Sequence, residues 1–301
     1  MIAVVILATR WGAIRASQPA YLITLLVVAV LGATGVAWSL VSVGSGRRHR
    51  VRRAHRVRTV IARVLGVAGT VVLAAVLLWL RPLPATPRAV ASMHGTPQVT
   101  VVDSRSLIEL RPRGATTRTG LVFYPGALVD PRAYVPLLTA LASHGFTVDI
   151  IKPPYGIAFL ATGAPGGIIA SQPAVTRWVI GGHSLGGVVA SSYAAAGHPG
   201  VRGLLLWASY PNGSIAHATF LHVTSVSAGN DGLATPAKID AAKPDLPPDT
   251  TYVVVAGAVH ADFGDFGTQR GDGTPTIGHR PAQSEIETAS LALLERVDRA
   301  P

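Results

Sequence analysis

Gly182-His-Ser-Leu-Gly186 is the feature that most constrains how this chain can fold, because it fits the pattern G-x-S-x-G. In a nucleophile elbow, a serine with this spacing of glycines sits on a strained turn between a strand and a helix. Val175–Ile180 is rich in β-branched and aromatic residues and predicts the strand. The small residues of Gly187–Ala196 predict the helix. We therefore expect Ser184 to be a catalytic nucleophile, the alternative being a tight turn without chemistry.

Short strands alternate with helices from about Pro97 onward. The predicted strands are 99–102, 107–110, 119–124, 146–151, 175–180, 204–208, 219–226 and 251–255, and the predicted helices are 133–142, 187–196 and 281–297. Such alternation is typical of an α/β fold with a mostly parallel sheet and helices on both faces.

A serine nucleophile needs a base and an orienting acid, which follow an elbow serine in the order acid, then histidine. Asp231 follows the predicted strand 219–226 and stands beside Gly232 in a turn. His260 follows the last predicted strand, 251–255. We predict that His260 is the general base and that Asp231 holds its imidazole in the productive tautomer.

Other acidic residues and histidines have weaker claims. Asp262 and Asp265 lie too close in sequence to the predicted base to be the usual acid, although they can shape its loop. His183 is expected to pack beneath the nucleophile. His217 and His222 lie near a predicted strand and are alternative candidates for a substrate contact.

An oxyanion hole requires two backbone N–H groups. The first is expected from Leu185, directly after the nucleophile. The second is expected from Ala127, in the loop that follows the strand ending at Tyr124, where Gly126 lets the backbone approach a substrate closely. The alternative for this loop is an ordinary Pro-Gly turn.

Two apolar runs mark the N-terminal third. Tyr21–Val43 is 23 residues long without a charge, enough to cross a bilayer core as a helix. A second run ends at Leu80, between Arg63 and Arg81. The seven arginines of residues 46–58 separate the runs, and such a loop is expected on the cytoplasmic side. The alternatives are a signal peptide cleaved after Ala89-Val-Ala91 and a nucleic-acid-binding arm.

The distribution of charge argues against nucleic-acid binding. Twelve of the 26 Lys and Arg residues precede residue 95, whereas all 15 acidic residues lie at or beyond Asp103. The remaining 14 basic residues leave the C-terminal part near neutral, without the broad basic surface that phosphates require. The chain has no cysteine, which excludes thiol catalysis.

The chain resembles the α/β-hydrolase fold superfamily and, more narrowly, small membrane-tethered bacterial hydrolases of the dienelactone-hydrolase-like kind. The matching segments are Phe123-Tyr-Pro-Gly126, Gly181–Gly187, Gly229-Asn-Asp-Gly232, His260–Gly267 and Gly271-Asp-Gly-Thr-Pro-Thr276. This resemblance covers roughly residues 97 to 298. It implies a hydrolytic mechanism without naming a substrate.

These observations give an expected organisation. Residues 1–95 would form a membrane anchor, and residues 96–301 an α/β-hydrolase catalytic domain outside the cytoplasm. The anchor comprises spans at about 21–43 and 62–80, a basic cytoplasmic loop at 46–58 and a Pro-rich linker at 81–95.

The expected activity is that of a cell-membrane serine hydrolase. It would cleave a small-molecule acyl ester through Ser184, His260 and Asp231, with no metal or organic cofactor. The alternative is a non-catalytic module of the same fold that binds a ligand or partner at the membrane.

Overall fold

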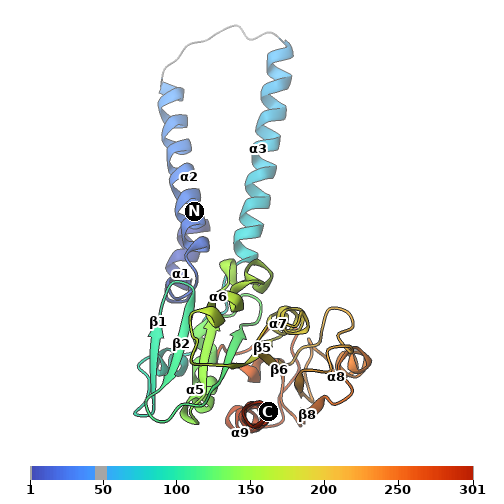
Figure 1. The fold of residues 1–301 in the computed structure, drawn as a ribbon. Coiled ribbons are helices and arrows are strands. Elements are labelled where there is room, and N and C mark those ends of the chain that lie inside the picture. Colours follow the sequence, from blue (N-terminus) through green and yellow to red (C-terminus); the bar gives the residue numbers. More distant parts are fainter. Residues whose placement is uncertain (1, 45–52, 301) are drawn as a thin grey trace. The chain divides into compact units, whose positions relative to one another are not determined.

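A computed structural model describes residues 2–44 and 53–300, which divide into two compact units (Figure 1). The first comprises the described residues of Met1–Arg15 and Pro19–Arg81. The second comprises Ala16–Gln18 and Pro82–Pro301, without the last residue. Most of the predicted basic loop 46–58 lies outside the described residues.

The first unit is helical. Its helices are α1 (Ile2–Ala16), α2 (Ala20–Gly44) and α3 (Arg53–Trp79). The last two contain almost all of the predicted spans 21–43 and 62–80. Within residues 2–44 and 53–300, no helix combines the length and apolarity that a membrane crossing requires.

The second unit is built on one eight-stranded sheet. Its strands are β1 (Val99–Asp103), β2 (Leu107–Pro112), β3 (Thr119–Tyr124), β4 (Thr147–Ile151), β5 (Arg177–His183), β6 (Val201–Trp207), β7 (His222–Ala228) and β8 (Thr251–Val255). They lie in the order β1-β2-β4-β3-β5-β6-β7-β8. The hairpin β1–β2 is antiparallel and β2 pairs antiparallel with β4, whereas all later neighbours are parallel. The predicted mostly parallel sheet is therefore confirmed.

Helices cover both faces of this sheet. They are α4 (Pro87–Ser92), α5 (Val135–Ser143), α6 (Ala164–Ala170), α7 (Leu185–Ala195), α8 (Pro236–Ala241) and α9 (His279–Arg299), with short 3-10 turns at 131–134, 154–156, 158–161, 243–245 and 260–263. On one face, α5 and α9 pack on Phe123 and Trp207. On the other, α6 and α7 pack on Val122 and Ile180. The two faces thus bury two separate apolar cores.

The central strand β3 shows why the sheet forms. All six of its residues are buried, since β4 and β5 flank it and a helical layer lies on each face. A strand enclosed in this way needs a near-continuous apolar run rather than an alternating one. Its parallel neighbours end at one edge of the sheet, and the loops at that edge carry the predicted site residues.

The segment expected as an extended linker, 81–95, has a different structure. Its extended part, residues 82–86, is followed by the short helix α4, whose N-cap Thr86 accepts a hydrogen bond from the Ala89 amide at 3.3 Å. Pro87 starts the helix at a position where its missing N–H costs nothing. Ala89 is fully buried within the second unit.

Residues 82–88 run against two loops of the sheet edge, and we refer to them as the strap. The Leu83 amide donates to the Leu128 carbonyl at 2.8 Å, and the Asp130 amide donates back to Leu83 at 2.9 Å. The Thr86 amide donates to the Asp265 carbonyl at 2.8 Å. The compact unit therefore includes residues preceding the expected domain boundary at 96.

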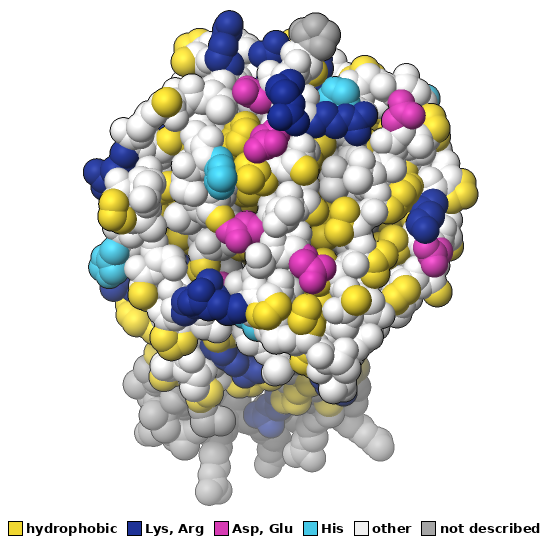
Figure 2. Space-filling model, turned by 90° about the horizontal axis from the view of Figure 1, so that it is seen from below, with side chains coloured by type: hydrophobic (Ala, Val, Ile, Leu, Met, Phe, Trp, Pro, Cys, Tyr) yellow, Lys and Arg dark blue, Asp and Glu magenta, His cyan; other side chains and the backbone are white. Residues whose placement is uncertain are grey.

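The surface of the second unit carries both signs of charge. On the face shown in Figure 2, acidic and basic side chains lie interspersed among apolar ones. No extended stripe of one sign crosses that face.

Candidate active site

Ser184 lies at the sharp turn between β5 and α7. Its backbone adopts φ 52° and ψ −124°, a conformation that costs a non-glycine residue on the order of 1–3 kcal/mol. Two hydrogen bonds hold it: the Ser184 amide donates to the Trp207 carbonyl at 2.9 Å, and the Ser209 hydroxyl donates to the Ser184 carbonyl at 2.7 Å. The end of β6 and the residues that follow it therefore fix the strained residue on both sides of its Cα.

The glycines of the G-x-S-x-G pattern are required by close packing. A Cβ at Gly182 would collide with the backbone of Gly186 and Gly187. A Cβ at Gly186 would collide with the carbonyl oxygens of Tyr124 and Pro125. The start of α7 thus lies directly against the end of β3, which brings the amide of Leu185 close to the predicted oxyanion loop.

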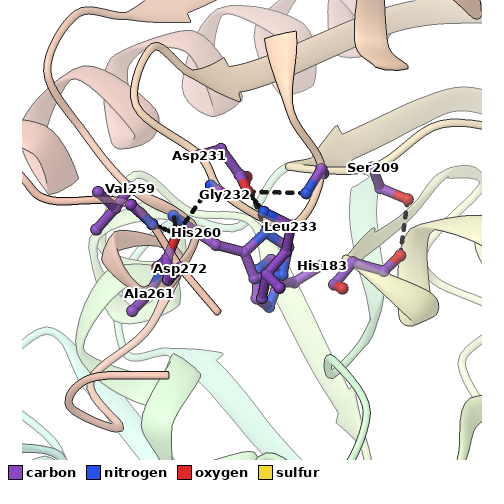
Figure 3. Close-up of polar contacts among 12 residues, drawn as sticks. His183, Ser209, Asp231, Gly232, Leu233, Val259, His260, Ala261 and Asp272 are labelled. Atoms are coloured by element: carbon purple, nitrogen blue, oxygen red, sulfur yellow. Dashed lines mark hydrogen bonds and ion pairs between the residues drawn. The ribbon is translucent and has the colours of Figure 1, made fainter. Parts of the chain in front are cut away.

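The structure brings Asp231 and His260 together, although they lie 29 residues apart. Asp231 Oδ2 lies 2.8 Å from His260 Nδ1, and both side chains are buried (Figure 3). The other carboxylate oxygen accepts hydrogen bonds from the amides of Leu233 at 2.7 Å and Ala234 at 2.8 Å. These bonds aim the carboxylate at the imidazole.

The pairing determines which nitrogen of His260 carries a proton. A carboxylate can only accept, so in the neutral imidazole Nδ1 donates to Asp231 and Nε2 carries the lone pair. In the described part of the chain, Nε2 is buried and has no hydrogen-bond partner, so no hydrogen bond joins it to the Ser184 hydroxyl. A buried polar atom without a partner is costly, and here it is the atom that a general base must use.

The two predicted oxyanion donors flank the elbow. Leu185 is the first residue of α7, where amides have no partner within the helix. The loop and cap hydrogen bonds among residues 2–44 and 53–300 include none donated by the Leu185 or Ala127 amide. The neighbouring Gly126 amide is engaged, since it donates to the Tyr134 hydroxyl at 2.9 Å. This bond fixes the loop while leaving the Ala127 amide available.

His183 packs beneath the elbow, as expected from the sequence. Its Nδ1 lies 2.9 Å from the Tyr134 hydroxyl, and its ring centre lies 4.5 Å from that of His260. Burial, with a smaller effect of the neighbouring His260, lowers the pKa of His183 well below its ordinary value. A neutral His183 adds no positive charge beside the base. His217 and His222, the alternative histidines, are not part of this cluster.

Three further carboxylates surround the loop that carries His260. Asp262 accepts from the Val259 amide and pairs with His279, each at 2.8 Å, so it shapes the loop. Asp265 lies 3.1 Å from the other nitrogen of His279. Asp272 contacts the base loop directly, through the amides of His260 and Ala261 (Figure 3). Asp272 had no predicted role, and the signal for it in the sequence is an aspartate between two glycines.

Between β4 and β5, residues 154–173 form two 3-10 turns, at 154–156 and 158–161, and the helix α6. The Tyr124 hydroxyl donates to the carbonyls of Ala161 at 2.9 Å and Thr162 at 3.0 Å, which attaches the segment to the end of β3. A cavity of about 660 Å³ lies along it, with Phe159 and Ile168 in its lining. Neither the elbow serine nor the predicted base lines this cavity.

Comparison with known proteins agrees with this arrangement. Residues 120–285, more than half of the chain, match the Alpha/beta hydrolase family. The turn of Ser184 between a strand and a helix, and the chain order serine, aspartate, histidine, match the pattern of an α/β-hydrolase fold. The chain belongs to the Alpha/beta hydrolase family and is a hydrolase by fold. The residues 2–44 and 53–300 contain no group of His, Asp and Glu side chains arranged to hold a metal ion.

Several solved structures are similar. An α/β serine hydrolase without a lid from Xanthomonas campestris is 13% identical, with a TM-score of 0.49 over 68% of this chain and 98% of that one. A thermostable esterase from Pseudomonas putida is 15% identical, with a TM-score of 0.48 over 67% and 84%. A thermophilic esterase from Thermogutta terrifontis is 16% identical, with a TM-score of 0.46 over 68% and 97%. A search of the curated proteins finds no match.

Proposed function

We propose that the protein is a serine hydrolase that cleaves the ester bond of a small acyl substrate. The observation that carries the proposal is the buried pair of Asp231 and His260, whose Nε2 atom has no partner among the described residues. The strained backbone of Ser184 supports it, because such strain persists where it serves a site.

The proposed reaction proceeds through an acyl-enzyme. His260 Nε2 takes the proton of Ser184 Oγ as that oxygen attacks the acyl carbon, and the amides of Ala127 and Leu185 stabilise the oxyanion. The imidazolium, stabilised by Asp231, then gives its proton to the leaving alcohol. A water molecule attacks the acyl-enzyme with His260 again as the base, which releases the acid and restores Ser184.

Labelling with a fluorophosphonate tests the nucleophile. We expect the wild-type chain to be labelled and Ser184→Ala to lose the label entirely, because only Ser184 lies at the elbow. The matched control is Ser192→Ala, an exposed serine of the same helix, which should keep the label. Labelling of another serine in Ser184→Ala would refute the assignment, and an unlabelled wild type would favour the non-catalytic binding module.

The rate of ester hydrolysis tests the general base. Loss of one triad member can remove several powers of ten from kcat, so we expect His260→Gln to retain only residual turnover of p-nitrophenyl esters. His217→Gln, an exposed histidine, is the control and should stay near the wild-type rate. The reverse pattern would show that the base was misassigned.

We also propose that the apolar runs 21–43 and 62–80 anchor the protein in the cell membrane, with the second unit outside the cytoplasm, although no helix of the described residues meets the length and apolarity of a crossing. The charge-free run 21–43 supports this, together with large apolar side chains that lie more than half exposed on α2 and α3. Examples are Val30, Leu31 and Leu65. Such a surface is unfavourable in water, and lipid would cover it. Side chains of residues 36–60 lie outside the described part.

Protease added to intact spheroplasts tests the orientation. The arginines of residues 46–58 are costly to translocate and favour the anionic inner leaflet. We therefore expect the second unit to be digested and the arginine-rich segment to be spared. Protection of the second unit would reverse the orientation. A mature protein that starts near Ser92 would instead show a cleaved signal peptide.

A further inference from the structure

Three loops meet behind the pair of Asp231 and His260. The acid loop (229–234) follows β7, and the base loop (256–264) follows β8. The third, residues 267–277, precedes α9 and contains the segment Gly271-Asp-Gly-Thr-Pro-Thr276, to which the proposed mechanism gives no role. This third loop is called the brace loop below.

One carboxylate of the brace loop contacts all three loops. Asp272 Oδ1 accepts from the amides of Gly232 at 3.2 Å, His260 at 3.1 Å and Gly273 at 2.7 Å. Asp272 Oδ2 accepts from the amide of Ala261 at 2.9 Å. Figure 3 shows Asp272 beside His260 and Ala261 of the base loop. A carboxylate, with two oxygens that both accept, can serve four donors arranged in this way.

The contacts of Asp272 reach the neighbours of both reacting groups. Gly232 directly follows Asp231, so the hydrogen bond to the Gly232 amide holds the backbone next to the acid. The second contact is the backbone amide of His260 itself, so the carboxylate fixes the residue that carries the base. The distance of 2.8 Å between Asp231 Oδ2 and His260 Nδ1 depends on both loops, and Asp272 is bound to both.

The backbone around Asp272 fits closely against the acid loop. A Cβ at Gly273 would overlap the Asn230 carbonyl oxygen, so only glycine permits this approach. Asn230 Nδ2 donates to the Thr274 carbonyl at 3.0 Å, which adds a second attachment. The Thr276 amide donates to the Gly257 carbonyl at 2.8 Å, in the base loop. The brace loop is therefore attached to both other loops at several points.

We propose that Asp272 is a positioning residue that holds the acid loop and the base loop in register. The proposal rests on the proposed function, because it concerns the same acid and base. Asp272 itself touches no reacting atom. Its effect is on geometry: a displacement of about 1 Å between reacting groups can cost about 100-fold in rate.

Two substitutions in the full-length protein test this role. In Asp272→Ala all four hydrogen bonds are lost. In Asp272→Asn the remaining oxygen can accept as Oδ1 does, but the amide NH₂ would face the N–H of Ala261, donor against donor. We expect kcat for a p-nitrophenyl ester to fall roughly 100-fold in the alanine variant and roughly 10-fold in the asparagine variant, with KM changed less than about threefold. Asp249→Asn, an exposed aspartate elsewhere on the second unit, is the matched control and should match the wild type.

A spectroscopic measurement separates positioning from a general loss of stability. The proton between His260 Nδ1 and Asp231 is expected to give a low-field ¹H resonance, absent in His260→Gln. We expect this resonance to be lost or shifted in both Asp272 variants and unchanged in Asp249→Asn. An unchanged resonance, or wild-type kcat in Asp272→Ala, would overturn the proposal. If the alanine variant does not fold, the asparagine variant decides by the same measurements.

Failure of this proposal can be told from failure of the proposed function. If the wild type is not labelled at Ser184, the hydrolase assignment fails, yet the resonance still reports whether Asp272 holds the pair together. If the wild type is labelled and the Asp272 variants match it in kcat and resonance, only the positioning role fails.

Discussion

His279 is held between two carboxylates at the side of the base loop. Its Nδ1 lies 2.8 Å from Asp262 and its Nε2 lies 3.1 Å from Asp265. The hydrogen bond to Asp262, then that to Asp265, raises the pKa of His279 to about 9. For Asp265, burial alone would raise the pKa, but His279, Arg88 and Gln283 together lower it. An imidazolium thus joins the start of α9 to the base loop at neutral pH.

The raised pKa of His279 makes a contribution to the free energy of unfolding that depends on pH. Because the folded state binds the proton more tightly, the contribution is fully present below the ordinary histidine pKa of about 6.5 and is lost as pH rises to about 9. We expect His279→Gln to lower Tm by roughly 2–4 °C at pH 6 and by much less at pH 9.5. Thermal unfolding across this range measures the difference.

The control for that series is His217→Gln, an exposed histidine. Its Tm difference from the wild type should stay small at each pH. If the Tm of His279→Gln stayed below that of the wild type by a constant or growing amount toward pH 9.5, the prediction would be contradicted. The titration of His279 would then make no contribution to stability.

At the scale of elements, the elbow depends on how closely α7 approaches the end of β3. We expect Gly186→Ala to lower kcat/KM at least about 100-fold, because the new Cβ would push Leu185 and its amide away from the oxyanion loop. The control is Gly167→Ala in α6, where a Cβ meets open space and alanine favours the helix by up to about 1 kcal/mol.

Ester hydrolysis and circular dichroism of the two glycine variants give the comparison. Gly167→Ala should keep both activity and fold. If Gly186→Ala were as active as Gly167→Ala, the contact between α7 and the end of β3 would not set the position of the oxyanion donors.

Elements with a continuous apolar run were predictable from the sequence. The bounds of β3 and β8 agree with the predicted ranges 119–124 and 251–255, because turn residues flank a short apolar run in each case. The predicted strand 219–226 begins later, at His222, since hydrogen-bonded turns occupy residues 215–221. Alternation along the chain was therefore enough for the class of fold but not for every boundary.

The site divides in the same way. Ser184, Asp231 and His260 are predicted as site residues from the motif and the chain order, and the structure places the last two in contact. Asp272 was not predictable, because its partners come from loops 11 to 40 residues away and follow no period. The helix α4 was missed because its flanking prolines indicate extended chain, although Thr86-Pro87 is also a helix start.

At the scale of the whole molecule, the strap makes the boundary of the catalytic unit testable. We expect a chain starting at Pro82 to be active and one starting at Thr96 to lose about tenfold or more in kcat/KM. The shorter chain lacks the bonds from Leu83 to the oxyanion loop and from Thr86 to Asp265, each worth about 0.5–1.5 kcal/mol. Equal activity and equal Tm of the two truncated chains would show that the strap is dispensable.

The strap also affects any form of the protein that a peptidase releases. A peptidase that cut after Ala91 would release the sheet with its nucleophile, acid and base, but it would leave Leu83 and Thr86 behind with the helices. The released fragment would lack the backbone hydrogen bonds from Leu83 and Thr86 that hold its loops in place. Proteolytic release would therefore lower the proposed hydrolytic activity. Full activity would be found only where the uncut chain is located.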